Sequence, residues 1–410
     1  MPFQELPLAG IRVIELATYV LGPGAATVLS DFGAEVIKIE RPGIGDPYRY
    51  LSYVPPMPKA EMNYCWLLDG RNKQSLALDL TQAEGRDILL RLIATADVLI
   101  TNFQPSILKK LRLTYEDLQA VNERLIYASA TGYGETGDEV EAPGFDMTAY
   151  WARSGLMDSI HNAEAEPTLS VAGQGDHPSS MTLFGGVMLA LYQRERTGRG
   201  TKVSTSLLAN GAWANSCMLQ AALCEAVPYA KPTRTAAFNP LVNHYVTRDG
   251  KRFIFCLIQA DKDWPNLCRA LGLPELMAEP RFATIAARSE HARELVALLD
   301  AAIAEKDLAE WVYLFAEHDL TWSPVLTTFE AAADQQMQAA GIFVDFEHPA
   351  HGCVRTVNSP LFLHEVEKAV PQPAPEIGQH SLEILRQLGC EEAELRQLIE
   401  RRVVVPPASQ

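Results

Sequence analysis

The stretch IRVIELATYVLGPGAATVLSDFGAEVIKIE spans residues 11–40. Its apolar run Ile11–Glu15 predicts a short buried strand, and Glu35–Ile39 predicts a second one. Between them, Ala25–Phe32 predicts a helix. A strand, a helix and another strand in this order form the βαβ unit of a parallel sheet. We therefore expect an α/β fold whose large domain is Rossmann-like.

The loop after the first strand has a second interpretation, a dinucleotide-binding site. It contains Gly22-Pro23-Gly24, and Glu40 ends the second strand. However, Thr27 stands where the G-x-G-x-x-G pattern needs a third glycine or alanine, and Pro23 has no N–H for a phosphate. A nicotinamide or flavin oxidoreductase remains an alternative, which an assay of cofactor absorbance would test.

Two later strands end in polar or glycine-bearing loops. Val98–Thr101 is followed by Asn102-Phe103-Gln104-Pro105, and Leu125–Ser129 is followed by Thr131-Gly132-Tyr133-Gly134. In open α/β sheets, ligands bind beyond the carboxyl ends of the strands. We expect these loops to line one crevice.

A carboxylate flanked by glycines occurs in Gly173-Gln174-Gly175-Asp176-His177-Pro178. Apolar residues then recur with helical spacing, so that Pro178–Arg194 predicts an amphipathic helix. Asp176 is either an N-cap that binds free N–H groups of this helix, or a reactive group. Gly173 and Gly175 favour the second reading, because they leave space for a ligand to approach the carboxylate.

Composition excludes several classes of function. The chain has 410 residues and a formal net charge of −16, which opposes binding to nucleic-acid phosphates. Its seven cysteines are scattered without a C-x-x-C pair, so neither a disulfide framework nor a metal site is indicated. There is neither a signal-peptide pattern nor an apolar run long enough to span a membrane. We expect a cytoplasmic protein.

The character of the sequence changes after residue 224. Asn243–Thr247 and Arg252–Ile258 flank an Asp249-Gly250 turn, which predicts a β-hairpin. Helical patterns follow it. We expect five segments along the chain: the first part of the large α/β domain at 1–224, a linker at 225–235, a smaller α+β domain at 236–323, a second linker at 324–342, and the C-terminal part of the large domain at 343–410.

Several blocks together resemble the class III coenzyme A transferases, the superfamily of formyl-CoA transferase and carnitine CoA-transferase. These blocks are Leu8–Glu15, Gly173–Met181, Arg194–Ser204 and Glu376–His380. The resemblance implies that Asp176 is a nucleophile and that the chain forms an interlocked homodimer. It implies acyl-CoA and organic acids as substrates, with neither a metal nor a tightly bound cofactor.

The resemblance also implies a set of coenzyme A contacts. Lys73, which precedes the third strand, and Lys110 would bind phosphates together with Arg41, although each lysine alone is more typical of a solvated surface. Val20 and Thr131 depart from the longer polar side chains of formyl-CoA transferase, so its oxalate chemistry does not carry over. The implied contacts are Tyr19, Val20, Leu21, Arg41, Lys73, Asn102, Phe103, Lys110, Leu111, Thr131, Gly132 and Tyr133.

Other residues point to a branch of the superfamily. The resemblance extends to α-methylacyl-CoA racemases, but these have a histidine base where this chain has Phe145. The motif Trp151-Ala152-Arg153-Ser154-Gly155 most resembles the one in the enzymes that activate 2-hydroxy acids. Family transferases cover the aspartate with a glycine run. This chain has no such run, so the resemblance does not identify its active-site lid.

We therefore expect a CoA-transferase that moves coenzyme A between organic acids through aspartyl-acyl anhydride and aspartyl-CoA thioester intermediates. Its acceptor would be a short-chain 2-hydroxy acid or a dicarboxylate. His177 would support Asp176 without reacting itself. The alternatives are a racemase-like isomerase and a binding protein of the same superfamily with an inactive site.

Overall fold

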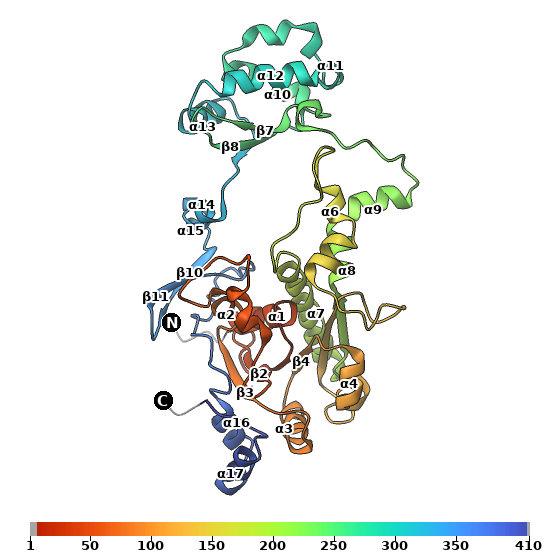
Figure 1. The fold of residues 1–410 in the computed structure, drawn as a ribbon, viewed down its shortest axis with the longest axis vertical. Coiled ribbons are helices and arrows are strands. Elements are labelled where there is room, and N and C mark those ends of the chain that lie inside the picture. Colours follow the sequence, from red (N-terminus) through yellow and green to blue (C-terminus); the bar gives the residue numbers. More distant parts are fainter. Residues whose placement is uncertain (1–5, 408–410) are drawn as a thin grey trace. The chain divides into compact units, whose positions relative to one another are not determined.

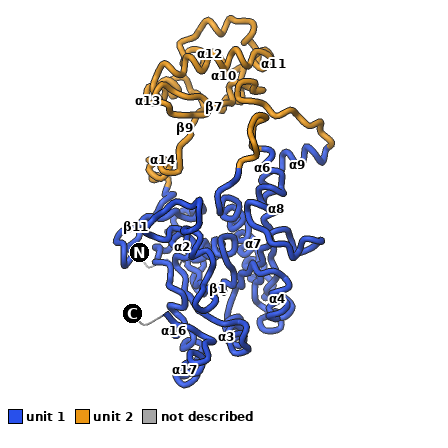
Figure 2. The backbone as a smooth tube through the Cα atoms, viewed as in Figure 1, with its two compact units in different colours: residues 1–159, 169–224, 341–410 blue, residues 160–168, 225–340 orange. Residues whose placement is uncertain are grey.

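The computed structural model describes residues 6–407. Contacts divide the chain into two compact units (Figure 2). The smaller unit consists of residues 160–168 and 225–340, and the rest of the described chain forms the larger unit. The C-terminal residues from 341 onward thus belong to the same unit as the N-terminus.

The larger unit is built on a parallel sheet of six strands in the order β3-β2-β1-β4-β5-β6 (Figure 1). Its strands are β1 (Arg12–Leu16), β2 (Glu35–Glu40), β3 (Lys73–Ala77), β4 (Val98–Thr101), β5 (Ile126–Thr131) and β6 (Lys202–Ser206). The predicted α/β class with a parallel sheet is confirmed. The strand order reverses between β1 and β4, where open α/β sheets place their ligands.

Helices cover both faces of the sheet, because successive strand residues point to opposite faces. Val13 packs with α1 (Leu21–Asp31) and α7 (Asp176–Thr197). Ile14 packs on the other face with α3 (Ala83–Ile93). The same second face holds α4 (Pro105–Leu111), α5 (Tyr115–Gln119), α16 (Ser381–Gln387) and α17 (Glu392–Glu400).

The remaining elements of the larger unit are short. A 3-10 helix at Pro47–Tyr53 and α2 (Tyr64–Asp69) follow β2, and a π-helix at Asp146–Ala152 and α6 (Leu156–Ser159) follow β5. The helices α8 (Leu207–Ala214) and α9 (Ser216–Leu223) come after β6, and β10 (Phe343–His348) pairs with β11 (Gly352–Val357).

The smaller unit contains an antiparallel sheet in the order β7-β8-β9. The predicted hairpin is confirmed as β7 (Val242–Val246) and β8 (Arg252–Cys256), and β9 (Trp322–Pro324) adds a third strand. The helices are α10 (Ala260–Leu271), α11 (Ile285–Glu290), α12 (Ala292–Ile303), α13 (Leu308–Glu317), α14 (Thr328–Ala332) and α15 (Gln335–Ala339). Phe253 and Phe255 of β8 pack on Phe315 of α13 in its core.

Among the described residues, no helix has both the length and the apolar character needed to cross a membrane.

Candidate active site

Asp176 is the first residue of α7, two residues earlier than the predicted helix start. Gly175, not Asp176, occupies the N-cap position. The interpretation of Asp176 as an N-cap is therefore wrong, because its side chain projects from inside the first turn. In that turn the N–H groups of His177 and Ser179 bond to the carbonyls of Gly173 and Gly175, and Pro178 has no N–H. The turn therefore offers the carboxylate mainly the positive end of the helix dipole.

The two glycines before Asp176 make room for the protein's own side chains. A Cβ on Gly175 would lie 2.6 Å from Cγ of Tyr150. Gly173 has a φ of +89°, and a Cβ there would lie 3.1 Å from Nδ1 of His177. The glycines thus allow tight packing behind the carboxylate, and this replaces our expectation that they open a path for a ligand.

Asp146 fixes the loop that leads to Asp176. It is buried at the start of the π-helix, and its Oδ2 accepts hydrogen bonds from the N–H groups of Gly173 at 2.9 Å and Gly175 at 3.4 Å. Sequence reasoning missed this residue. The available signal was its place directly after Phe145, a position we had singled out for other reasons.

The environment of Asp176 disfavours its charge. Burial raises the pKa of the carboxyl to about 7, and the charges of Asp146 and Asp69 contribute to this rise, whereas His177 opposes it. At neutral pH, Asp176 is therefore partly protonated, and its carboxylate is more basic than that of an exposed aspartate.

His177 carries a positive charge beside Asp176. Its Nε2 lies 3.1 Å from Oδ2 of Asp69 and its Nδ1 lies 3.1 Å from the carbonyl oxygen of Gly173. Burial alone would lower the pKa of this imidazole, but the Asp69 carboxylate and the carbonyl raise it to about 9. Both nitrogens face acceptors, so the imidazolium donates two hydrogen bonds.

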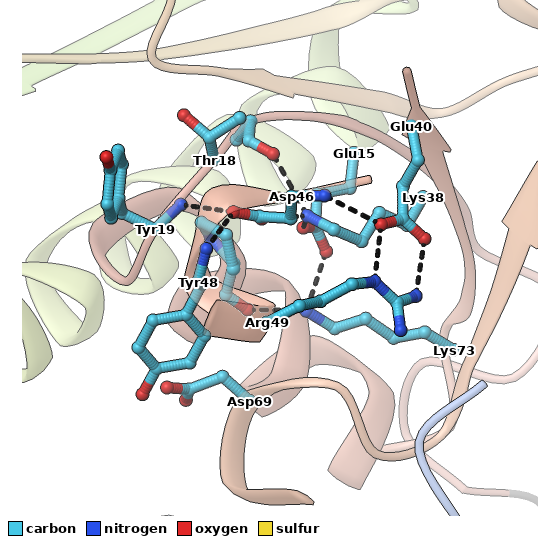
Figure 3. A network of polar contacts seen from close by, with 12 residues as sticks. Glu15, Thr18, Tyr19, Lys38, Glu40, Asp46, Tyr48, Arg49, Asp69 and Lys73 are labelled. Carbon is cyan, nitrogen blue, oxygen red and sulfur yellow. Dashed lines mark hydrogen bonds and ion pairs between the residues drawn. The ribbon is translucent and has the colours of Figure 1, made fainter. Parts of the chain in front are cut away.

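Asp69 is itself anchored in the core. It is the last residue of α2, and the phenol of Tyr48 donates a hydrogen bond to its carboxylate. Burial raises the pKa of Asp69, but His177 and Tyr48 lower it more, and the net pKa lies below its usual value. Figure 3 shows the side chains of Tyr48 and Asp69 pointing toward one another. Asp69 thus links the site to a buried polar network.

This network fixes the loop after β1 (Figure 3). Oδ1 of Asp46 accepts hydrogen bonds from the N–H groups of Tyr19 at 3.0 Å and Tyr48 at 2.9 Å. Its Oδ2 lies 2.7 Å from Nζ of Lys38, which also pairs with Glu15. Tyr19 has a φ of +63°, a conformation that costs a non-glycine residue free energy. The charged network below it holds the residue in this conformation.

Asn102 fixes the same loop from the neighbouring strand. Its Oδ1 accepts a hydrogen bond from the Thr18 N–H at 2.9 Å, and its Nδ2 donates one to the Thr18 carbonyl at 2.7 Å. Asn102 follows β4 and Thr18 follows β1. The amide therefore joins the two strand ends at the point where the strand order reverses.

Lys73 does not lie where we expected a phosphate ligand. Its side chain is fully buried, and Nζ lies 2.6 Å from Oε2 of Glu15 and donates to the carbonyl of Pro23 at 2.8 Å. Burial, which outweighs Glu15, lowers the pKa of this lysine. Because its partners lie inside the fold, Lys73 belongs to the buried network, and we withdraw it from the set of phosphate contacts.

The dinucleotide interpretation also does not fit the geometry. Glu40 forms two hydrogen bonds with Arg49, at 2.8 and 2.7 Å, and accepts a third from Ser75 at 2.6 Å. Gly24 lies within α1, where a Cβ would come within 2.6 Å of Ser180 Oγ. Gly24 thus permits close packing of α1 on α7, and the Glu40 carboxylate is engaged by protein groups.

A cavity of about 220 Å³ lies next to Asp176. Phe145, which is half exposed, also lines it and meets Tyr19 edge to face. This cavity brings together a first group of the predicted contacts: Tyr19, Val20, Leu21, Asn102, Thr131 and Gly132.

A second group lines a larger cavity of about 970 Å³: Arg41, Phe103, Lys110 and Leu111. Arg86 and Arg112, which we did not predict, lie there too. Tyr133 and Lys73 line neither cavity; Tyr133 packs against the core on the α1 side. The predicted contacts therefore gather in two places, with Asp176 at the smaller one.

Comparisons with known proteins identify the family of this chain. The model of the family "CoA-transferase family III" matches residues 8–381. The cinnamoyl-CoA:phenyllactate CoA-transferase of Clostridium sporogenes is 32% identical, covering 95% of each chain. The (R)-2-hydroxy-4-methylpentanoate CoA-transferase of Clostridioides difficile is 30% identical, covering 97% of this chain and 99% of that protein.

A solved structure is similar as well. A CAIB/BAIF family protein from Brucella suis matches with a TM-score of 0.82 and 30% identity, covering 94% of this chain and 100% of that one. The predicted resemblance is confirmed over nearly the whole chain. The protein belongs to CoA-transferase family III and is an enzyme of that class.

Proposed function

We propose that this enzyme moves coenzyme A between two organic acids, with Asp176 as the nucleophile. The observation that carries the proposal is the position of Asp176: its carboxyl group, with a raised pKa, stands at a helix start and lines a cavity at the carboxyl ends of the strands.

Four steps complete one transfer. An oxygen of Asp176 attacks the thioester carbonyl, the C–S bond breaks, and a mixed anhydride and CoA thiolate result. The thiolate attacks Cγ of Asp176, releasing the donor acid and leaving an aspartyl-CoA thioester. The acceptor carboxylate then attacks Cγ of this thioester, the C–S bond breaks, and a second anhydride and CoA thiolate result. The thiolate attacks the acceptor carbonyl and frees Asp176.

The charges around Asp176 favour this chemistry. Asp146 and Asp69 destabilise the carboxylate, whereas a neutral anhydride or thioester at the same place is not repelled. The raised pKa also makes the carboxylate a stronger nucleophile. The positive end of the α7 dipole lies near Asp176 and favours the oxyanion that each attack creates.

Coenzyme A phosphates fit the larger cavity. Arg41 and Lys110 are exposed there, and such cations compensate locally for the net charge of −16. A phosphate at these side chains would leave the pantetheine arm to reach toward Asp176. No tightly bound cofactor enters this scheme.

The acceptor acid is proposed to be a short-chain 2-hydroxy acid or a dicarboxylate. The two relatives support the first class, since they are named for phenyllactate and 2-hydroxy-4-methylpentanoate. A racemase-like isomerase is the second candidate, because a carboxylate with a pKa of about 7 also suits a general base. Against it, Phe145 lines the cavity and cannot exchange a proton.

Mass spectrometry of the enzyme after incubation with acyl-CoA tests the proposal. The wild type should carry CoA on the peptide that contains Asp176, and hydroxylamine should remove it. Asp176→Asn should fold and bind CoA but form no adduct and show no transfer. A fresh Asn variant that turns over substantially would contradict the mechanism. Solvent deuterium appearing at the α-carbon without transfer would favour the isomerase.

We also propose a cytoplasmic homodimer. All seven cysteines lie in the described part of the chain and are free thiols, which suits a reducing compartment. Large apolar side chains, among them Leu189 and Trp213, are exposed on the larger unit, which suits contact with a second copy.

A further inference from the structure

A third cavity, of about 390 Å³, lies beside α1 and the first turns of α7. It is a separate cavity from the one that contains Asp176. Most of its walls are apolar, with Val28 from α1, Met181 from α7, and Ile342, Val357 and Phe362 from the C-terminal part of the larger unit. The proposed function assigns it no role.

Two residues connect this cavity to the reactive carboxyl group. Asp69 and His177 are part of its wall, and both interact electrostatically with Asp176. His177 follows Asp176 directly in the first turn of α7. The cavity is therefore adjacent to the place where an acyl group would be bonded to Asp176.

The polar groups of the cavity already have partners. The guanidinium of Arg71 forms two hydrogen bonds with Asp31, at 3.0 and 2.8 Å, and a third with a backbone carbonyl. The imidazolium of His177 donates to Asp69 and Gly173. Among the described lining residues, Arg71 and His177 are the cations, and each is already paired with a buried carboxylate, Asp31 or Asp69.

Lys368 holds in place the part of the cavity wall that Asn358, Ser359 and Phe362 form. Nζ of Lys368 donates to Oδ1 of Asn358 at 2.9 Å and to Oγ of Ser359 at 2.9 Å. The same ammonium group lies 4.3 Å from the centre of the Phe362 ring. The loop that carries Phe362 is thus anchored, and the cavity is defined before a ligand arrives.

Cavity size decides where a bulky acyl group would go. Pockets for small molecules usually measure about 300–1,000 Å³. The cavity at Asp176, of about 220 Å³, lies below this range. The apolar cavity, of about 390 Å³, lies within it.

We propose that this cavity, beside His177 and Asp69, holds the side chain of the organic acid and selects monocarboxylic acids with a branched or aromatic side chain over dicarboxylates. This proposal rests on the proposed function and narrows its substrate class. A dicarboxylate would bring its second carboxylate among apolar side chains, beside cations whose charge Asp31 and Asp69 already balance, a costly placement. An apolar side chain would instead exchange water for apolar contact.

Two substitutions alter the cavity at its exposed rim, where folding is least at risk. Val357→Phe narrows it, and Phe362→Ala widens it; both side chains are about half exposed. Val121→Phe is the matched control, because Val121 is exposed and is not among the residues that line the three cavities described. Each variant is assayed with a common CoA donor and acceptors that range from acetate and lactate to phenyllactate, with succinate and glutarate alongside.

The wild type should prefer the branched and aromatic acids to the dicarboxylates by tenfold or more in kcat/KM. Val357→Phe should lower kcat/KM for the bulky acids by about tenfold or more, a size effect usual for apolar pockets, and leave acetate and lactate within about twofold. Phe362→Ala should shift the preference toward bulkier acids. Val121→Phe should match the wild type.

The outcomes separate this inference from the proposed function. The CoA adduct on the Asp176 peptide is measured first for every variant, and its absence in the wild type would overturn the function itself. Adduct formation with equal effects on all acids, or a wild-type preference for dicarboxylates, would overturn the assignment of the cavity alone. A changed oligomer mass in Val357→Phe with unchanged acid preference would assign the cavity to a contact between two copies of the chain, which also overturns it.

Discussion

At the scale of single residues, burial raises the pKa of Asp176 and two neighbours of opposite charge adjust it further. Asp146 and His177 shift its pKa in opposite directions, upward and downward respectively. Because attack requires the carboxylate, we expect kcat/KM for acyl-CoA, which reports the free enzyme, to rise with pH and to level off above about 7. Below that value, the rate should fall about tenfold per pH unit.

Two substitutions are expected to shift the midpoint of this pH profile in opposite directions. Asp146→Asn removes a negative charge but keeps an oxygen that can accept from the Gly173 N–H, so the midpoint should move to lower pH. His177→Gln removes the positive charge, so the midpoint should move to higher pH. Measurements of kcat/KM for acyl-CoA between pH 5 and 9 give the midpoint for each variant. Shifts of the two variants in the same direction would show that other groups control the ionisation.

At the scale of elements, the strands and the hairpin could be predicted because each depends on residues that are close together in the sequence. The apolar pattern of Ile11–Glu15 and the Asp249-Gly250 turn each predicted the element that forms there. Asp176 was identified as the candidate nucleophile from the blocks around it. The packing role of the glycines before Asp176 could not be predicted from the sequence, because Tyr150 comes from a distant segment and meets Gly175 only in the folded chain.

Lys73 shows the same limit for a charged residue. Its sequence context is a polar turn, which suggested exposure. In the structure, β3 lies two strands away from β1, yet the Lys73 ammonium pairs with Glu15 of β1 beneath the site. Lys38 and Asp46 complete the cluster. Such a network depends on the order of the strands, which no single segment encodes.

This difference between exposed and buried cations can be measured. Arg41→Ala and Lys110→Ala remove exposed cations from the larger cavity, and each should weaken CoA binding by about 1–3 kcal/mol with little change in stability. Lys73→Ala breaks a buried ion pair and should lower the free energy of unfolding by about 3–5 kcal/mol. Calorimetric titration with CoA and urea unfolding measure the two effects.

The control is the comparison among the three variants. If Lys73→Ala kept full stability and lost CoA affinity, Lys73 would return to the phosphate contacts. If Arg41→Ala and Lys110→Ala bound CoA as the wild type does, the larger cavity would lose its proposed role.

At the scale of the whole molecule, the larger unit exposes apolar side chains that a solitary chain would not be expected to show. Leu189 and Tyr192 on α7 are 73% and 66% exposed, and Trp213 on α8 is 81% exposed. The helices α7 and α8 contact each other. These exposed residues are the candidates for contact with a second copy, in line with the proposed homodimer.

Sedimentation velocity at micromolar concentration should give a particle of twice the 45.2 kDa chain mass. Placing charges on this surface with Leu189→Glu and Trp213→Glu should drive dissociation, because a charge buried in an interface without a partner is costly. Glu310→Gln on α13, an exposed position in the smaller unit, provides a control. A wild type that sediments as a monomer would contradict the proposed homodimer. A double variant that remains dimeric would place the contact elsewhere on the chain.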